Sequence, residues 1–239
     1  MVAGARPEPS VELPEDSILP LERLTRWPFF RELDLKTCQE VAALMRLETH
    51  PPGELLLLDG DRCDALYIVA RGYASHSHVS VEGREHVLGY IGPGHPLNLV
   101  AVVDGRPQCG SIYSLTEVTL YSLPVTPFGG LLANRADLGA AVSRMLAREA
   151  RQLTETARGL ALDPVRKRLA AFLLQSAEHS PPYQRWTQDL IAAHIGSVRD
   201  VVGRVLRDMV REGILSRERG QLVILDRGRL EKEAGIGGE

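Results

Sequence analysis

The segment from Trp186 to Leu215 constrains the fold most strongly, because it contains two amphipathic helical patterns separated by a single glycine. Thr187 can cap the first, short helix, and Gly196 lies where the chain must turn sharply. The second pattern begins at about Ser197 and carries an apolar stripe on one face and arginines on the other. Two helices joined in this way, the second basic on its outer face, are typical of a helix-turn-helix that enters the DNA major groove.

The flanking sequence extends this unit into a winged helix-turn-helix. Asp163 and Pro164 form a helix cap followed by proline at the first helical position, and we place the start of a C-terminal domain, residues 163–239, there. Beyond the second helix, residues 213–225 predict a β-hairpin wing with a basic tip. From residue 163 to 225, ten Arg or Lys stand against seven acidic residues, a net of +3, whereas the first 162 residues carry a net of −5. The C-terminal domain is therefore the part that a phosphate backbone attracts.

Between residues 53 and 123 the sequence predicts many short strands. Glycines separate short apolar or alternating segments at fairly regular intervals, at positions 60, 72, 83, 94 and 105. Turn signals at this spacing are typical of a sandwich or barrel, and Gly83 suits a hairpin apex because glycine tolerates a positive φ. We assign residues 21–132 to a β-rich sensor domain with flanking helices. Residues 1–20 are rich in proline and acids, lack the apolar region of a signal peptide and are expected to form a flexible tail.

Residues 133–162 contain no proline and predict one long helix. Its apolar residues are spaced alternately by four and three positions, at Val142, Leu146, Ala150, Leu153, Ala157 and Leu160. Such spacing is the seam of a helix that packs against a partner helix, which favours a homodimer. On periodicity alone, packing of this helix on its own domain is an equal alternative.

Four motifs, in this order along the chain, match one known family. They are Trp27-Pro-Phe-Phe-Arg-Glu-Leu, Leu66-Tyr-Ile-Val-Ala-Arg-Gly-Tyr, Asp163-Pro-Val-Arg-Lys-Arg-Leu-Ala-Ala-Phe-Leu-Leu and Gly196-Ser-Val-Arg-Asp-Val-Val-Gly-Arg. With them the chain resembles the CRP/FNR superfamily of bacterial transcription regulators over nearly its whole length. The resemblance implies an α+β fold: an N-terminal β-roll (a jelly-roll of the cyclic-nucleotide-binding type), a long dimerisation helix and a C-terminal winged helix-turn-helix. It also implies a homodimer that binds double-stranded DNA at a palindromic operator and contacts RNA polymerase.

Carried over position by position, the resemblance assigns DNA contacts to the second helix and its surroundings. Arg199 and Arg204 would read guanines, since arginine can bond bidentately to guanine O6 and N7. Asp200 stands where the family usually has glutamate and is one methylene shorter, so it either reaches a base or orients a neighbouring arginine. Arg207 and Arg211, farther along the helix, are expected to be a solvated face with acidic partners. Phosphate contacts are expected from Ser197, Gln188 and Arg219.

The cyclic-nucleotide cassette of the family is altered in this chain. Where members that bind the nucleotide have Gly-Glu for the ribose and Arg-Ser for the phosphate, this chain has Asn98-Leu99 and Gln108-Cys109. A cyclic phosphate is a permanent anion, and without the arginine its burial loses a charge-assisted partner. Cyclic AMP is therefore not expected as the effector, unless Arg106 takes over through a register shift. A regulator without any effector is a further alternative, in which the cassette would be filled by Leu97, Leu99 and Val100.

Histidines offer a different kind of effector site. His76 and His78 are one residue apart on a predicted strand and so share a face, and His86 follows on the opposing strand. Imidazoles can hold haem or a divalent metal, which would make the chain a haem- or metal-based sensor; partly exposed histidines without a ligand are the alternative. The spacing also resembles the first metal motif of the cupins, so a cupin-like metalloenzyme fused to a DNA-binding domain is a less favoured reading, with Glu82 as its candidate acid or base. The predicted effector pocket comprises His76, His78, His86, Leu97, Asn98, Leu99, Gln108 and Cys109.

Other function classes find no support in the sequence. No Ser-His-Asp, P-loop or Rossmann pattern is present, so no enzymatic activity is expected. The longest apolar runs fall far short of the roughly 20 residues that cross a bilayer, so no membrane association is expected. The cysteines Cys38, Cys63 and Cys109 lack CxxC or metal-binding spacing and suit a reducing cytoplasm.

Overall fold

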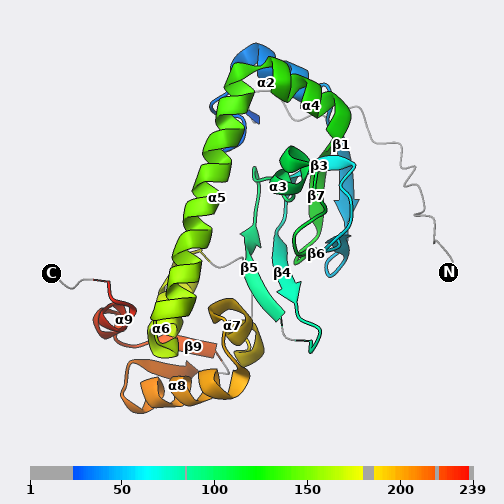
Figure 1. The fold of residues 1–239 in the computed structure, drawn as a ribbon. Helices are drawn as coiled ribbons and strands as arrows, with labels where there is room; N and C mark the ends of the chain where they lie inside the picture. The colour runs from blue at the N-terminus through cyan, green and yellow to red at the C-terminus, as the bar shows by residue number, and fades with distance from the viewer. Residues whose placement is uncertain (1–23, 84, 180–185, 219–220, 237–239) are drawn as a thin grey trace, which may run out of the picture.

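The chain forms an N-terminal β domain and a C-terminal helical domain joined by one long helix (Figure 1). The computed structural model describes residues 24–83, 85–179, 186–218 and 221–236. The N-terminal domain comprises α2 (Leu35–Ala42), β1 (Arg46–His50), β2 (Leu55–Leu57), β3 (Ala65–Arg71), β4 (Ala74–Val79), β5 (Glu85–Ile91), α3 (Leu99–Asp104), β6 (Ser111–Ser114), β7 (Val118–Pro124) and α4 (Val125–Asn134). The long helix is α5 (Ala136–Leu162). The C-terminal domain comprises α6 (Val165–His179), α7 (Gln188–Ile195), α8 (Arg199–Arg211), β8 (Leu215–Glu218), β9 (Gln221–Ile224) and α9 (Arg227–Ala234).

Two antiparallel sheets pack against each other and form the predicted β-roll. One sheet has the strand order β1-β7-β3 and the other β2-β6-β4-β5. Val69 and Leu120 from the first sheet share a core with Ala74 and Ile112 from the second, and none of the four is more than 1% exposed. Burial of each of the larger side chains stabilises the fold by about 1.5–3 kcal/mol. The predicted hairpin at Gly83 is confirmed: its φ is +78° and it joins β4 to β5.

Helix α5 packs on the β-roll domain along its N-terminal part and then leaves it. Leu138 and Val142 are buried in a core that includes Phe128 of α4. Every residue from Ala147 to Arg158 is exposed in the single chain. Figure 1 shows α5 continuing past the sheets to the C-terminal domain. About three turns of this helix are thus left exposed by the described part of the chain.

The predicted start of the long helix at residue 133 is wrong. Helix α4 ends at Asn134, α5 begins at Ala136, and Arg135 between them is extended, with φ −117° and ψ 103°. The Arg135 side chain donates from Nε to Glu40 Oε2 of α2 over 2.7 Å. This ion pair holds Arg135 in the extended conformation that separates the two helices. The apolar pattern continues across Arg135 with no proline or glycine beside it, so the sequence contains no signal for the break.

The C-terminal domain has its own apolar core and an ion-pair network that joins three helices. Its core includes Leu169 of α6, Ile191 of α7 and Leu206 of α8, all fully buried. Arg166 of α6 donates from Nε to Glu233 over 2.8 Å and from Nη1 to the C-cap residue of α8, Glu212, over 3.0 Å. The Arg166 guanidinium lowers the pKa of the Glu212 carboxyl. In the part of the chain described, no helix is both long and apolar enough to cross a membrane.

Candidate nucleic-acid interface and effector region

Helices α7 and α8 form the predicted helix-turn-helix. Thr187 caps α7, since its Oγ1 accepts from the backbone N–H of Leu190 over 3.2 Å. Gly196 ends α7 with φ +60°, and the N–H of Ser197 donates back to Ala192 over 2.9 Å. A left-handed residue at this point lets the chain reverse into α8 while satisfying the last carbonyls of α7.

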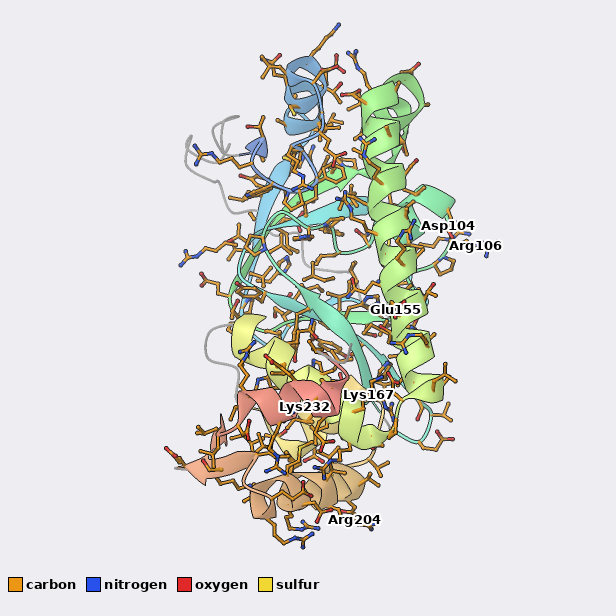
Figure 2. The ribbon with its side chains drawn as sticks, turned by 90° about the vertical axis from the view of Figure 1, so that its left-hand side faces the viewer. Asp104, Arg106, Glu155, Lys167, Arg204 and Lys232 are labelled. Atoms are coloured by element: carbon orange, nitrogen blue, oxygen red, sulfur yellow. The ribbon has the colours of Figure 1, made fainter. Side chains whose placement is uncertain are left out.

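Helix α8 presents arginines to solvent along one side. Val202, Leu206 and Met209 are fully buried on its inner side, while Arg199 and Arg204 are exposed. Arg204 projects from α8 at the end of the molecule farthest from the β-roll (Figure 2). The expected guanine readers are therefore free to enter a groove, which a buried or tightly paired arginine could not do.

Arg199 pairs with Asp189 in the structure, and the orienting of a neighbouring arginine by Asp200 stays a prediction. Arg199 Nη1 lies 3.4 Å from Asp189 Oδ2, on the first turn of α7, with both side chains about two-thirds exposed. An exposed pair of this kind contributes at most about 1 kcal/mol, so DNA can displace it. Asp200 itself is exposed on the first turn of α8, where a base contact is open to it.

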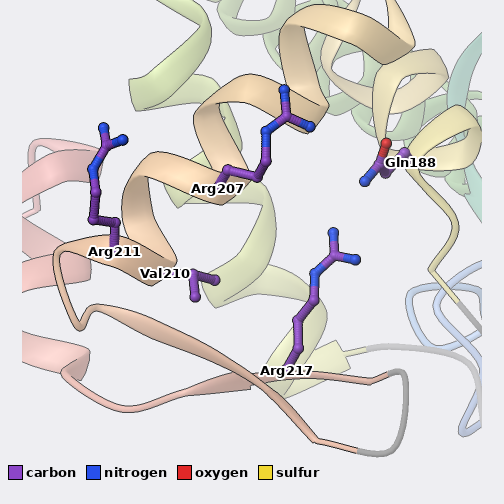
Figure 3. Close-up of a pocket in the computed structure, with 5 residues that line it drawn as sticks. All are labelled: Gln188, Arg207, Val210, Arg211 and Arg217. Carbon is purple, nitrogen blue, oxygen red and sulfur yellow. The ribbon is translucent and has the colours of Figure 1, made fainter.

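A shallow groove beside α8 gathers polar and basic side chains from three elements. Figure 3 shows Gln188 from α7, Arg207 from α8 and Arg217 from β8 around it, with Arg211 at its far side. The groove has a volume of about 360 Å³. Gln188 lies close to α8 because the helix has glycine at 203, where an added Cβ would sit 3.0 Å from Gln188 Oε1. The arrangement suits a phosphate, which arginine binds through several parallel hydrogen bonds.

This groove partly corrects the expectation for the later arginines of α8. Arg211 has an acidic partner as expected, with Nη2 2.6 Å from Asp208 Oδ1. Arg207 instead faces the groove with Arg217 and Gln188. Its place three residues after Arg204 could have suggested this, but Arg217 joins it only through the fold of the wing. Strands β8 and β9 confirm the wing, and the tip residue Arg219 lies outside the described residues.

Several residues of the predicted effector pocket are instead buried in the structure of the β-roll. Leu97 and Leu99 are 5% and 4% exposed and belong to apolar cores. Asn98 bonds to β3 with both ends of its amide: Oδ1 accepts from Tyr67 N over 3.0 Å and Nδ2 donates to Ala65 O over 2.8 Å. These three side chains thus hold the β-roll together in the structure, and their contact with an effector stays a prediction.

Gln108 and Cys109, which stand where nucleotide-binding members hold the phosphate, supply no positive charge. Gln108 is 4% exposed and donates from Nε2 to the carbonyl of Gly110 over 3.1 Å. Arg106, the candidate substitute, is 83% exposed and stands 3.9 Å from Asp104 at the surface (Figure 2). A buried cyclic phosphate would thus find no arginine among these side chains.

His78 and His86 face each other across β4 and β5, but the histidine side chains bond to two different sets of partners. His76 and His78 of β4 lie beside Cys109: His76 Nε2 is 2.5 Å from the Cys109 carbonyl oxygen, and His78 Nε2 is 3.7 Å from Cys109 Sγ. Burial lowers the pKa of His76. His86 of β5 was expected in the same pocket but donates from Nδ1 to the carbonyl of Ala193 in α7 over 2.8 Å. It therefore belongs to a contact between the sensor domain and the helix-turn-helix.

The arrangement of these side chains does not add support for a metal site on the histidines. Among the described residues, no group of three or more His, Cys, Asp or Glu is placed to hold a metal ion. Glu82, the acid of the cupin-like alternative, is exposed in the turn before β5 and accepts from Ser80 Oγ over 2.8 Å. A haem or metal on His76 and His78 stays a prediction.

The predicted dimer seam divides into a covered and an exposed part. Val142 is 3% exposed in the core of its own domain, and Leu146 packs against the same core, so the prediction that Val142 faces a partner is wrong. The remaining seam residues are exposed in the single chain: Ala150, Leu153, Ala157 and Leu160. The two alternatives for this helix thus each describe one part of it.

Comparison with known proteins agrees with this architecture. The cyclic nucleotide-binding domain matches residues 47–135 and the Crp-like helix-turn-helix domain matches residues 167–233. A CRP-like cAMP-activated global transcriptional regulator of Mycobacterium tuberculosis is 26% identical over 221 residues, covering 89% of this chain and 99% of the relative. A CRP/FNR-family transcriptional regulator from Thermus thermophilus is 28% identical with a TM-score of 0.65, covering 81% of this chain and all of the other.

A more distant solved structure has the same fold. The c-di-GMP-responsive global regulator of Xanthomonas campestris is 21% identical with a TM-score of 0.69, covering 80% of this chain and 99% of its own. The two domain matches together span more than half of the chain, in the order that the structure shows. The chain belongs to the CRP/FNR superfamily of transcription regulators.

Proposed function

We propose that this chain is a non-enzymatic transcription regulator that binds a specific inverted repeat in DNA as a homodimer. The observation that carries the proposal is the exposed basic side of α8, which runs from Arg199 and Arg204 into the groove of Arg207 and Arg217. Base-reading arginines at the start of a helix, followed by phosphate-binding side chains from the wing, supply both specificity and affinity. Gln188 at the first turn of α7 adds a phosphate contact from the helix N-terminus.

The homodimer is supported by the uncovered part of α5. Leu153 is 50% exposed and Leu160 39% exposed, at heptad spacing, and Leu153 lies in the stretch from Ala147 to Arg158 where every residue is exposed among the described parts of the chain. A second copy of α5 would bury this stripe in a parallel pair. Two reading heads on one two-fold axis then require half-sites about one helical turn, roughly 34 Å, apart.

The effector is proposed to be something other than cyclic AMP, or absent. By their names, the Mycobacterium relative responds to cAMP and the Xanthomonas regulator to c-di-GMP, so regulators of this fold take different effectors. In this chain the buried Gln108 and the outward Arg106 leave a cyclic phosphate without a cation. Contact with RNA polymerase remains a prediction from the family resemblance, and a cytoplasmic location remains one from the pattern of the cysteines.

Three contacts connect the sensor domain and α5 to the reading head and offer a route for a change in the sensor domain. His86 of β5 bonds to Ala193 of α7, and the ring of Tyr90 lies 4.8 Å from that of His194. At the end of α5, Leu160 packs against Gly196 in the turn of the helix-turn-helix. In the proposed mechanism, these contacts pack in more than one way, and each packing gives α8 a different orientation. An effector that binds one state more tightly shifts the equilibrium toward that state, by an amount set by the difference in its affinity for the two.

Selection of binding sites from random DNA tests the proposal. The purified chain is incubated with a random duplex library at fixed salt, and bound sequences are recovered and sequenced. The expected motif is an inverted repeat with guanines in each half-site, lost in the double variant R199A/R204A. Recovery of no enriched motif, or of a single unrepeated half-site, would contradict the proposal.

A further inference from the structure

Three side chains from separate parts of the β-roll form a connected cluster around Cys109. Asp59 lies in the loop after β2, His78 on β4, and Cys109 just before β6. His78 Nδ1 is 3.2 Å from Asp59 Oδ2, and His78 Nε2 is 3.7 Å from Cys109 Sγ. The imidazole therefore stands between a carboxylate and a thiol.

The backbone around the cluster fixes this order. The N–H of Gly110 donates to Asp59 Oδ1 over 2.9 Å, which holds the carboxylate toward His78. The carbonyl of Cys109 is bonded to His76 Nε2. Gly110 has φ +84°, and an added Cβ there would overlap the His76 ring. The position of the thiol is thus set by neighbours on two strands.

The hydrogen bonds define the role of each group. A carboxylate accepts, so His78 donates its Nδ1 proton to Asp59, which leaves Nε2 facing the thiol as the atom that can take its proton. A cysteine whose base is oriented by a third group is the arrangement of an activated nucleophile. Thiolate formation decides how fast a cysteine reacts.

The other two cysteines lack these features. Cys38 is fully buried, its Sγ points at the carbonyl of Phe30, and burial raises its pKa. Cys63 is partly buried, and its Sγ donates to the side-chain oxygen of Gln108 over 3.8 Å. Cys109 is exposed, so a reagent in solution can reach it. Cys38 and Cys63 therefore serve as internal controls for the reactivity of Cys109.

We propose that Cys109 is a redox-sensitive site that reacts with hydroperoxides. The thiol proton passes to His78 Nε2, and the thiolate sulfur attacks one peroxide oxygen. A sulfur–oxygen bond forms as the oxygen–oxygen bond breaks; sulfur loses two electrons and the peroxide gains them. The leaving hydroxide of hydrogen peroxide, or alkoxide of an organic hydroperoxide, takes the proton from His78 and departs as water or alcohol, which leaves a sulfenic acid on Cys109. A hydroperoxide suits the site because its leaving group needs the proton that His78 has received.

The site is placed to influence regulation, a step that rests on the proposed function. Cys109 precedes β6, which pairs with β4, and β4 pairs with β5, whose His86 bonds to Ala193 of α7. A sulfenic acid adds an oxygen between the thiol and His78 and must displace the imidazole or the Cys109 segment. Either movement disturbs the sheet whose strand β5 contacts α7, so oxidation is expected to alter DNA affinity.

The test treats the full chain with hydrogen peroxide and traps sulfenic acid with dimedone, with mass spectrometry reporting each cysteine separately. Cys109 should be labelled at least about tenfold faster than Cys63, and H78Q should slow it by a similar factor, since general bases contribute at least this much. D59N, which keeps the geometry but removes the charge, should slow it less, while C63S leaves Cys109 unaffected. Thermal melting shows that each variant is folded.

Two results would overturn the reactive site: labelling of Cys109 no faster than Cys63, or an unchanged rate in folded H78Q. DNA affinity before and after peroxide forms a separate arm, with C109S as its control. Operator binding that peroxide does not change would overturn the regulatory step while leaving the reactive thiol. A chain that binds no DNA at all would refute the proposed function, yet the dimedone result would still decide the chemistry.

Discussion

Leu160, near the C-terminal end of α5, packs directly against Gly196 in the turn of the helix-turn-helix. A Cβ added to Gly196 would overlap Leu160 Cδ2, and Arg168 Nη1 donates to the neighbouring carbonyl of Ile195 over 2.5 Å. The end of the long helix therefore rests on the turn that sets the angle between α7 and α8. A shift or rotation of α5 that extends to its C-terminal end therefore disturbs the contact between Leu160 and Gly196.

Replacing Gly196 with alanine should impair both folding and DNA binding. The residue has φ +60°, which costs a non-glycine residue about 1–2 kcal/mol, and the new methyl group must also push Leu160 away. Urea denaturation should show a loss of about 2–4 kcal/mol in unfolding free energy. Gly213→Ala is the matched control, because its φ is +73° but an added Cβ meets nothing within 4 Å. Equal losses in the two variants would show that Leu160 does not restrict the turn.

Arginines of α8 and of the wing should fail in different ways. Arg204→Ala should reduce the free energy of DNA binding by about 1–3 kcal/mol and relax specificity at one base position. Arg217→Ala should weaken binding to all sequences and lower the slope of log affinity against log salt concentration by about one. Fluorescence anisotropy against single-base variants of the operator, at several salt concentrations, separates the two patterns. Arg227→Ala, on α9, is the control. A uniform loss from Arg204→Ala would mean that this side chain contacts phosphate.

The exposed stripe of α5 should hold the dimer together. Leu153→Glu places a charge in the proposed seam and should convert the dimer to monomer, with loss of operator binding. Gln152→Glu adds the same charge one residue earlier, on the outward side, and should leave the dimer intact. Light scattering after size exclusion gives the mass of each. A dimeric Leu153→Glu variant would place the interface elsewhere.

Acidification should loosen the contact between the β-roll and α7. His194 donates from Nδ1 to Leu190, its Nε2 is buried without a partner among the described residues, and burial lowers its pKa. The neighbouring charged groups are His86, which lowers this pKa, and Glu85, which raises it. Because the folded state resists protonation, the unfolded chain binds more protons below about pH 6.5, the ordinary pKa. The stability from neutral His194 is thus present above that pH and lost as the pH falls.

Thermal melts between about pH 7 and pH 5.5 measure this effect, since carboxylates titrate mostly below that range. His194→Phe keeps an aromatic ring against Trp186 and removes the titrating group. It should melt with a flatter pH profile than the parent. A parallel slope in both proteins would assign the pH dependence to other groups, of which His76, also with a lowered pKa, is the first to examine.

Cyclic AMP should not stabilise the protein. A ligand at about 100 times its Kd raises the unfolding free energy by about 2.7 kcal/mol, which a melting curve detects easily. At about 1 mM cyclic AMP, a concentration that detects even weak binders, no change in Tm is expected because the phosphate finds no cation. The Mycobacterium relative serves as the positive control. A clear rise in Tm would show that a different side chain replaces the missing arginine.

Local pattern and motif order were enough to predict the β-roll, the helix-turn-helix and the wing. The uncovered seam from Ala150 to Leu160 also follows from spacing. What the sequence could not show depends on three-dimensional neighbours. The Asn98 side chain has a structural role because β3 lies next to it and its amide bonds to the backbone of Tyr67 and Ala65. The His86 side chain bonds to α7 although His86 pairs with His78 across the strands, because α7 lies against β5, a contact between residues 107 positions apart.

The most direct test of the account is the affinity of the dimer for its selected operator with either half-site randomised. Fluorescence anisotropy at one fixed salt concentration would compare the intact inverted repeat with each altered duplex. Two reading heads on a two-fold axis predict that loss of either half-site weakens specific binding by about 10³-fold or more, toward the non-specific level. Affinity that is unchanged when one half-site is randomised would contradict the dimeric reader.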